Sequence, residues 1–236
     1  MLLFVPQWSH SSDPNKPKTT YTLCNYDPVE NQEPNNWLRS EIIAVGDVQR
    51  VDVTVKYFSH LCLASFSFCN ESFAAYVWES NIRDQKIPDP INSFGSYRRF
   101  ATINHQDANP SFLTIPLRVN SKFIVLGFRD QGGCRTLFSV KVTYDLCPKK
   151  SLNNNLVALP RTLAPSNDLE SIPVNGSCTE NSFQAVEGSL SVLCESTGEW
   201  NTSRLQGRCV CKENMENNGG ICGGMFMGKN FSFYNH

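Results

Sequence analysis

The chain has 236 residues, of which 40% are hydrophobic, and a formal net charge of -1 at pH 7. This apolar content suffices for one sizeable core with small satellite modules. The near-zero net charge removes the bulk electrostatic case for binding nucleic acids or anionic membranes, because both need a concentrated excess of Lys and Arg. No segment approaches the roughly 20 apolar residues of a membrane helix, and the first residues form too short an apolar run for a signal peptide. We therefore expect that the secretion signal and any membrane anchor are missing from this chain, and that the sequence is a fragment or an incomplete gene model.

Residues 1–20 are mainly polar and contain three prolines, Pro6, Pro14 and Pro17, which predicts a flexible N-terminal arm. From residue 21 to 146 the pattern is that of short strands. Within residues 51–58 (VDVTVKYF), apolar and polar side chains alternate from Val51 to Tyr57, which is typical of a half-buried strand. Three further segments enriched in β-branched and aromatic residues follow: 72–80, 98–104 and 112–119.

The last strands of this region differ in pattern. Residues 122–128 (KFIVLGF) are apolar without alternation, which predicts a strand covered on both faces. A Gly-Gly turn then leads into a strand that we expect to run from Cys134 to Cys147. One face of that strand is predicted to carry Phe138, Val140, Val142 and Tyr144. Because no segment shows a helical stripe, the sequence predicts an all-β, antiparallel jelly-roll β-sandwich over residues 21–146.

The composition changes after Cys147. Residues 148–176 are rich in Pro and Asn with little periodicity, which predicts a connector at a domain boundary. Cysteines are dense from Cys178 onward. A region this short cannot bury enough apolar surface alone, so disulfides are expected to stabilise it by about 2 to 4 kcal/mol each.

Ten cysteines occur together with four Asn-x-Ser/Thr sequons. The sequons give four candidate glycosylation sites, Asn70, Asn175, Asn201 and Asn230. An even cysteine count beside sequons is typical of an oxidising, secretory compartment. The sequence therefore predicts an extracellular protein with paired cysteines, although spacing alone does not settle which cysteines pair.

Several segments resemble the extracellular part of Eph receptors. Residues 21–43 contain the Cys-Asn pair and the later Asn-Trp-Leu-Arg that open the ligand-binding domain of that family, here Cys24-Asn25 and residues 36–39. Residues 127–150 resemble the end of the same domain. The later stretches NGSC, GEW and GRCVC resemble the sushi-like start of the Eph cysteine-rich region, which leads into an EGF-like module. The resemblance covers roughly residues 21–222 in collinear order.

The resemblance implies five disulfides that use every cysteine. They are Cys24–Cys134 and Cys62–Cys69 in the jelly roll, Cys147–Cys194 and Cys178–Cys209 in the sushi-like module, and Cys211–Cys222 in the EGF-like one. The modules would then span 21–146 for the jelly roll, 147–210 for the linker and sushi-like module, and 211–236 for the start of the EGF-like module. Trp200, between two of the cysteines, is expected to be the aromatic plug of the small module rather than an exposed binding residue.

The function that the resemblance implies is binding of a cell-surface ephrin by a receptor tyrosine kinase, with the kinase outside this chain. In that family the ligand's loop enters a hydrophobic channel walled by long inter-strand loops near the short disulfide. The corresponding candidate ligand-binding residues here are His60, Phe66, Phe68, Phe94 and Tyr97. Exposed aromatic side chains on loops are typical interface anchors, and packing onto the edge of the sheet is their alternative role. The resemblance also leaves receptor–receptor clustering open.

The chain departs from the family pattern in two places. The family commonly has an Arg-Asp pair before the first cysteine of the short disulfide, where this chain has His60 and Leu61. The segment before residue 122 is much shorter than the ligand-gripping loop of the family and leaves only Asn120 and Ser121. A secreted or adhesion protein whose jelly roll and sushi module bind glycans or another protein is the alternative interpretation.

Catalytic and metal-binding patterns are missing from the sequence. The four histidines lack metal-ligand spacing, and no G-x-S-x-G nucleophile motif occurs. We therefore expect no metal, no cofactor and no catalytic residue in this chain.

Overall fold

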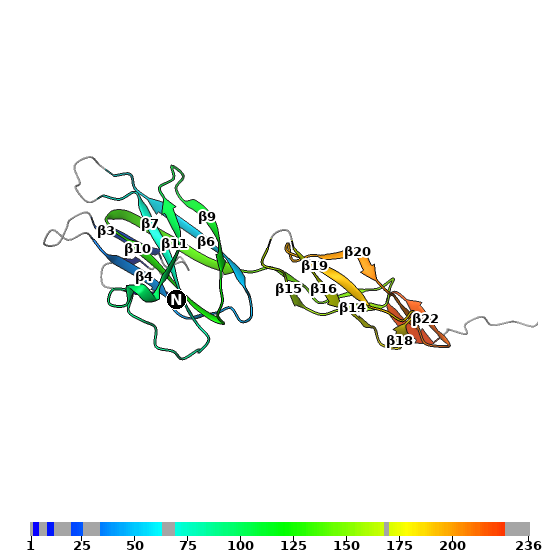
Figure 1. Ribbon diagram of the computed structural model, residues 1–236. Helices are drawn as coiled ribbons and strands as arrows, with labels where there is room; N and C mark the ends of the chain where they lie inside the picture. Colours follow the sequence, from blue (N-terminus) through cyan, green and yellow to red (C-terminus); the bar gives the residue numbers. More distant parts are fainter. Residues whose placement is uncertain are drawn as a thin grey trace, which may run out of the picture. The chain divides into compact units, whose positions relative to one another are not determined.

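The computed structural model describes residues 2–4, 9–11, 20–25, 34–62, 69–167 and 170–224. The chain divides into two compact units, Met1–Tyr144 and Asp145–His236. Both are built from antiparallel strands (Figure 1), and one turn of 3-10 helix, Phe94–Ser96, is the sole helical element among the described residues. The all-β prediction is confirmed.

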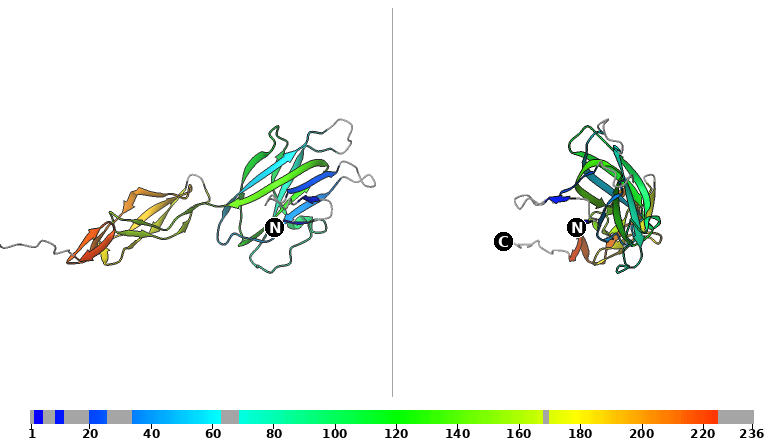
Figure 2. Two further views of the ribbon diagram at one scale, coloured as in Figure 1. Left: turned by 180° about the vertical axis from the view of Figure 1, so that it is seen from behind. Right: turned by 90° about the vertical axis from the view of Figure 1, so that its left-hand side faces the viewer.

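The first unit is a sandwich of two sheets, which two further views show as stacked layers (Figure 2). Sheet A consists of β1 (Leu2–Phe4), β4 (Asn36–Ser40), β5 (Ile43–Ala44), β7 (Ser72–Ser80), β8 (Arg98–Asn104) and β10 (Phe123–Asp130). Its order is β1-β4-β10-β7-β8, with β5 also paired to β10. Sheet B consists of β2 (Ser9–Ser11), β3 (Thr20–Asn25), β6 (Arg50–Ser59), β9 (Ser111–Arg118) and β11 (Gly133–Thr143). Its order is β2-β3-β11-β6-β9.

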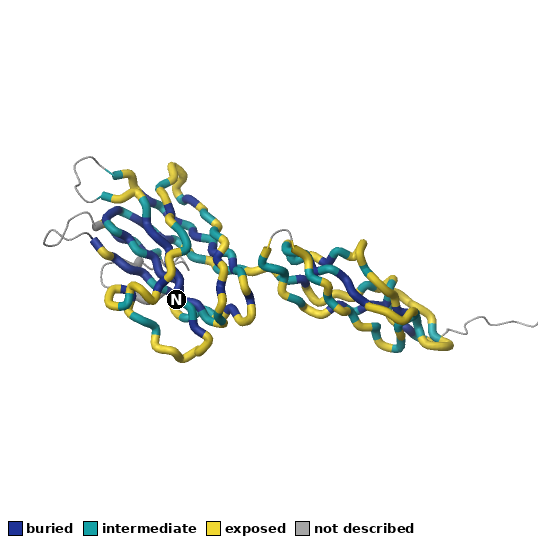
Figure 3. The backbone as a smooth tube through the Cα atoms, viewed as in Figure 1, coloured by how far each residue is buried: buried dark blue, intermediate teal, exposed yellow. Residues whose placement is uncertain are grey.

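The main core of the first unit lies between the two sheets, and strands β7 and β10 of sheet A are buried along most of their length (Figure 3). In β6 the side chains of Val51, Val53, Val55 and Tyr57 are buried, while the residues between them are partly exposed on the outer face. This alternation confirms the half-buried strand that the sequence predicts. Burial of such side chains stabilises the fold by about 25 cal/mol per Å² of apolar surface.

Strand β10 is buried on both faces, as its unbroken apolar sequence predicts. Leu126 and Phe128 contact the main core, while Val125 contacts a second apolar cluster on the outer face of sheet A. That cluster contains Trp37, Ala74, Tyr76, Trp78, Tyr97 and Val125. It includes residues of the connection between β7 and β8, residues 81–97, which we call the outer-face loop.

A glycine allows this loop and sheet A to pack closely. A Cβ atom at Gly127 would lie 3.1 Å from the Trp37 ring and 3.7 Å from the Tyr97 ring. A Cβ atom here would therefore require the Trp37 ring to shift by a few tenths of an ångström, while its distance to Tyr97 is an ordinary van der Waals contact.

Strand β11 differs from its prediction in length. It ends at Thr143, and a separate short strand, β12 (Leu146–Cys147), follows. No single strand therefore runs from Cys134 to Cys147, and Tyr144 lies beyond the end of β11.

A bulge also corrects the predicted face of β11. The pairing of β11 with β6 shifts between Leu137 and Ser139. Phe138 consequently lies on the outer face, where the ammonium group of Lys56 is 5.7 Å from the centre of its ring. Val140 and Val142 do pack against the core, but Phe138 does not share their face, because an inserted residue reverses the alternation of a strand.

Two described segments of the expected N-terminal arm are strands. Leu2–Phe4 pairs with β4, and Ser9–Ser11 pairs with β3. The described backbone of this part of the chain is thus paired to both sheets.

The second unit consists of short strands in small sheets. They are β12 with β15 (Thr162–Leu163); β13 (Lys150–Leu152), β14 (Val157–Leu159) and β17 (Ser177–Cys178); β16 (Ser171–Asn175), β19 (Ser191–Glu195) and β20 (Trp200–Gln206); β18 (Ser182–Gln184) with β21 (Cys209–Cys211); and β22 (Met215–Asn218) with β23 (Ile221–Gly224). The segment that the sequence predicts as a connector therefore contains four strands of this unit. Those strands are two to five residues long, too short to show periodicity.

The core of the second unit contains its cysteines. Cys147, Cys194, Cys209 and Cys222 are buried together with aliphatic side chains. Trp200 packs in the same cluster, and its indole N–H donates to the Pro148 carbonyl at 2.6 Å. Trp200 is thus the aromatic plug that the sequence predicts.

Candidate functional site

Both disulfides of the first unit lie at one end of its sandwich. Strands β3, β6 and β10 end there, at Asn25, Ser59 and Asp130, and strands β7 and β11 begin there. Cys24 and Cys134 are directly opposite each other on β3 and β11 and are bonded, and Cys62 is bonded to Cys69. We call this region, residues 59–62, 69–72 and 130–135 with Cys24, the disulfide-tied end.

Backbone hydrogen bonds fix the segments of the disulfide-tied end to one another. The His60 N–H donates to the Cys134 carbonyl at 3.0 Å, and the Asn70 N–H donates to the Gly132 carbonyl at 2.6 Å. The Cys62 N–H donates to the Glu71 carboxylate at 3.2 Å. The residues on both sides of the short disulfide are therefore held against the start of β11.

A buried ion pair lies beneath these segments. The Arg135 guanidinium is 1% exposed and its Nε is 2.8 Å from the carboxylate of Asp130, which is fully buried. Arg135 also donates to the hydroxyl of Ser59 and to the carbonyls of Asn70 and Ser72. Burial raises the pKa of Asp130 above its ordinary value, and the positive charge of Arg135 opposes that rise. One side chain thus holds the ends of β6, β7 and β10 together.

His60 is exposed at this end, next to the short disulfide. Its ring contacts the edge of Phe58, with 4.6 Å between the ring centres. The neighbouring Leu61 is 56% exposed. Phe66 and Phe68, the other predicted residues of this region, lie outside the described residues.

Phe94 and Tyr97 belong to the outer-face loop, and the structure places them differently. Phe94 is 43% exposed and its ring contacts Tyr76 and Trp37, with ring centres 5.4 and 5.9 Å away. Tyr97 is 5% exposed, and its hydroxyl donates to the Pro88 carbonyl at 2.9 Å. Burial raises the pKa of the Tyr97 phenol above 10. Phe94 is therefore accessible, while the Tyr97 side chain is turned inward onto sheet A.

Arg129 connects the outer-face loop to the disulfide-tied end. It precedes Asp130 in β10, and its guanidinium lies 4.9 Å from the centre of the Phe94 ring. The Arg129 Nε also donates to the Asn35 carboxamide oxygen at 2.7 Å. The same oxygen accepts a hydrogen bond from the Trp37 indole N–H. The sequence did not point to Arg129, because its partners lie far apart in the chain. Together, Phe94, Arg129 and Asn35 extend the candidate surface from the disulfide-tied end across the outer face of sheet A.

The short turn at Asn120 and Ser121 lies at the opposite end of sheet A. In the pairing of β10 with β7, Phe123 is opposite Ser80 at one end, and Arg129 is opposite Ala74 at the other. These ends are about 20 Å apart at roughly 3.3 Å per residue. The shortened segment is thus remote from the disulfide-tied end.

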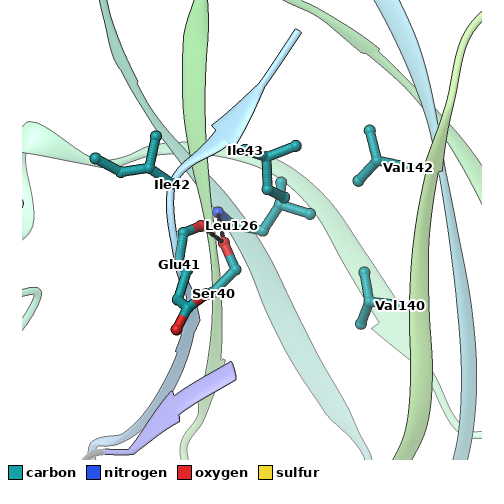
Figure 4. Close-up of a pocket in the computed structure, with 7 residues that line it drawn as sticks. All are labelled: Ser40, Glu41, Ile42, Ile43, Leu126, Val140 and Val142. Carbon is teal, nitrogen blue, oxygen red and sulfur yellow. Dashed lines mark hydrogen bonds between the residues drawn. The ribbon is translucent and has the colours of Figure 1, made fainter. Parts of the chain in front are cut away.

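A pocket in the first unit contains none of the predicted site residues. It has a volume of about 180 Å³ and is lined by Ser40, Glu41, Ile42, Ile43, Leu126, Val140 and Val142 (Figure 4). The Ser40 hydroxyl is already engaged, because it accepts the Leu126 N–H at 3.0 Å and donates to the Glu41 carbonyl. Five of the seven lining residues are aliphatic, and Glu41 is the one ionisable residue among them.

The described ranges contain no group of His, Cys, Asp and Glu side chains that could hold a metal ion. Nor, within the same residues, is any helix long and apolar enough to cross a membrane. The five disulfides of the structure are Cys24–Cys134, Cys62–Cys69, Cys147–Cys194, Cys178–Cys209 and Cys211–Cys222. These are the same five pairs that the resemblance to Eph receptors implies.

Comparison with known proteins gives matches over most of the chain. Residues 5–147 match the ephrin receptor ligand binding domain, and residues 150–211 match the ephrin cysteine rich domain. Both are ectodomain modules, which places this region outside the cell.

Ephrin receptors of type A and of type B are both similar to the chain. Ephrin type-A receptor 4-B of Xenopus laevis is 30% identical over 88% of the chain, ephrin type-A receptor 7 of Gallus gallus is 28% identical over 87%, and ephrin type-B receptor 3 of Xenopus laevis is 27% identical over 86%. The chain spans 21% of the length of each of these curated relatives. From the match over residues 5–147, the chain belongs to the family of the ephrin receptor ligand binding domain.

Proposed function

We propose that this region captures an ephrin on an opposing cell, for contact-dependent signalling by a longer receptor. The observation that carries the proposal is the match of residues 5–147 to the ephrin receptor ligand binding domain. The ligand would dock on the disulfide-tied end and on the adjoining Phe94–Arg129 surface. His60 and Leu61 would form the rim of that surface.

The chemistry of this surface suits protein recognition. Phe94 offers an accessible aromatic ring, and Arg129 lies against that ring while it is oriented by Asn35. Aromatic and arginine side chains are enriched among the residues that dominate binding energy. Two disulfides and the ion pair of Arg135 with Asp130 hold the adjoining strand ends before any ligand arrives. Such preorganisation lowers the entropy cost of binding.

The second unit would carry this surface without binding the ligand itself. We propose that it consists of a linker and sushi-like module over residues 147–210 and the start of an EGF-like module at 211–236. The Cys211–Cys222 disulfide would be the first of that EGF-like module. Receptor–receptor clustering remains a prediction.

The test is binding of the secreted chain to immobilised ephrins of both classes, measured by surface plasmon resonance. We expect saturable binding to at least one ephrin. Phe94→Ala and Arg129→Ala should each weaken binding about tenfold or more, the effect of losing roughly 1.4 kcal/mol at an interface.

Phe112→Ala is the matched control. Phe112 is also an exposed aromatic residue, at 62%, but it lies on the outer face of sheet B beside Lys56. Its removal should leave ephrin affinity unchanged. Glycan binding on an array without any ephrin binding would contradict the proposal and favour a lectin-like or adhesion role.

A further inference from the structure

Asn230, the fourth predicted glycosylation site, lies outside the described residues. The three sequons within them differ in the surroundings of their asparagine side chains. Asn70 is exposed at the disulfide-tied end, between Cys69 and the start of β7. Asn175 is exposed at the end of β16 in the second unit. Asn201 is partly buried within β20. Because a glycan is bulky and is attached through the side-chain amide nitrogen, these surroundings decide which asparagines tolerate it in the folded chain.

The side chain of Asn70 is held with its nitrogen available. Its carboxamide oxygen accepts two hydrogen bonds from the residue that completes the sequon, the Ser72 N–H at 3.0 Å and the Ser72 hydroxyl at 2.9 Å. This is a turn that asparagine favours. Since the oxygen faces Ser72, the amide nitrogen of the same planar group faces away from the turn, on an exposed residue.

The backbone around Asn70 is fixed. Its N–H donates to Gly132, and its carbonyl accepts from Arg135. The preceding residue is anchored by the Cys62–Cys69 disulfide. A group attached to Asn70 would therefore project from a defined point of the disulfide-tied end.

Asn201 shows the opposite arrangement. Its side-chain nitrogen donates to the Glu195 carboxylate at 2.7 Å, and its backbone is opposite Leu193 in the pairing of β19 with β20. The nitrogen that a glycan would need is thus turned onto the neighbouring strand. A glycan at Asn201 would crowd β19, whereas the Asn70 side chain is exposed and its nitrogen faces away from Ser72.

We propose that Asn70 carries an N-linked glycan and that this glycan limits the approach of protein ligands to the disulfide-tied end. Asn175 would carry a second glycan, remote from that surface along the chain, and Asn201 would remain unmodified. The part concerning ligand access rests on the proposed function, because it takes the disulfide-tied end as the ephrin-binding surface. The part concerning occupancy does not.

Occupancy is tested by glycopeptide mass spectrometry of the chain secreted from cultured animal cells. Release of glycans by a peptide-N-glycosidase in heavy-oxygen water would mark each formerly modified asparagine. We expect the mark on Asn70 and Asn175 and its absence on Asn201. An unmodified Asn70 would overturn the proposal whatever the chain binds.

Ligand access is tested with two variants that remove the same glycan through different atoms. Asn70→Asp retains the acceptor oxygen of the turn, and Ser72→Ala retains Asn70 without adding a charge. Both should raise the association rate for an ephrin about threefold to tenfold, within the range by which variants of one interface differ. Asn175→Asp, which removes a glycan from the second unit, should leave that rate unchanged.

The outcomes separate the two proposals. Equal association rates for the wild-type chain and both glycan-free variants would overturn the access role and leave ephrin binding intact. Absence of ephrin binding in all forms would overturn the proposed function and, with it, the access role, while the mass spectra would still decide occupancy. A rate that rises in Asn70→Asp but not in Ser72→Ala would assign the effect to the new charge and overturn the access role.

Discussion

The two units of this chain use disulfides in different places. In the described part of the first unit, the core between the two sheets contains no cysteine. Both disulfides of that unit lie where strands end. In the second unit, four cysteines are buried within the core itself. The first unit therefore depends on apolar burial for its stability and uses disulfides to hold the candidate surface. The second unit uses disulfides in place of apolar volume that so short a region cannot supply.

The largest effect should come from removing a disulfide of the second unit. Cys147→Ala together with Cys194→Ala opens a link between residues 47 apart in sequence, a loss of about 4 kcal/mol in the chain-entropy model. A buried cavity adds to that loss. We expect the second unit to lose its fold while the first unit remains folded.

Hydrogen-exchange mass spectrometry checks this outcome, because it reports on peptides of each unit separately. Peptides from β19 and β20 should lose protection, and peptides from β6 and β10 should keep theirs. Protection that persists in β19 and β20 would contradict the role given to the buried disulfides.

A similar but smaller loss is expected from a cavity in the first unit. Phe128→Ala removes a fully buried ring from the main core and should lower the free energy of unfolding by about 3 to 5 kcal/mol. Denaturant unfolding with the same exchange measurement should place this loss in the first unit alone. A simultaneous loss of protection in the second unit would show that the two units unfold together. It would contradict the view that each unit has its own source of stability.

Removing the short disulfide should cost less stability and more affinity. Cys62→Ala with Cys69→Ala opens a link of only 7 residues, worth about 2.5 kcal/mol in the chain-entropy model. The sandwich should remain folded, because its core is untouched. Ephrin affinity, measured by surface plasmon resonance, should fall, since the segment beside His60 loses its preorganisation. Unchanged affinity would show that the short disulfide does not contribute to ephrin binding.

Regular parts of this fold could be predicted from the sequence because burial on one face of a strand leaves a period of two. Residues 51–57 show that period, and β6 forms there. The unbroken apolar run in β10 likewise indicates two covered faces. The disulfide pairs followed from the resemblance to a family and not from the residues alone.

Irregular parts could not be predicted, for identifiable reasons. The bulge beside Phe138 adds one residue, which no period reveals. Arg135 occupies a strand position that the sequence does not mark as buried, because its partner Asp130 and its backbone acceptors are brought together only by the fold. The contact of Arg129 with Phe94 joins residues 35 positions apart for the same reason.

The smallest predicted effect tests whether the outer-face loop belongs to the stable body of the first unit. The Tyr97 side chain, at the end of that loop, is turned inward onto sheet A, and Tyr57 lies in the main core. Each phenol donates one hydrogen bond to a carbonyl, Tyr97 to Pro88 and Tyr57 to Asn104. Tyr97→Phe and Tyr57→Phe should each lower the free energy of unfolding by about 1 kcal/mol at neutral pH.

The pH dependence of the unfolding free energy above pH 10 distinguishes the two phenols further. Burial raises the pKa of both phenols above the ordinary value of 10.0. The unfolded chain therefore loses these protons first, so the stability that each phenol contributes below pH 10 is lost as the pH rises through its folded-state pKa. Each Phe variant should show a shallower decline in unfolding free energy above pH 10 than the wild-type chain. If only Tyr57→Phe flattens the decline, the outer-face loop opens independently and admits water to Tyr97, and Phe94 would then lie on a mobile segment rather than on a preorganised surface.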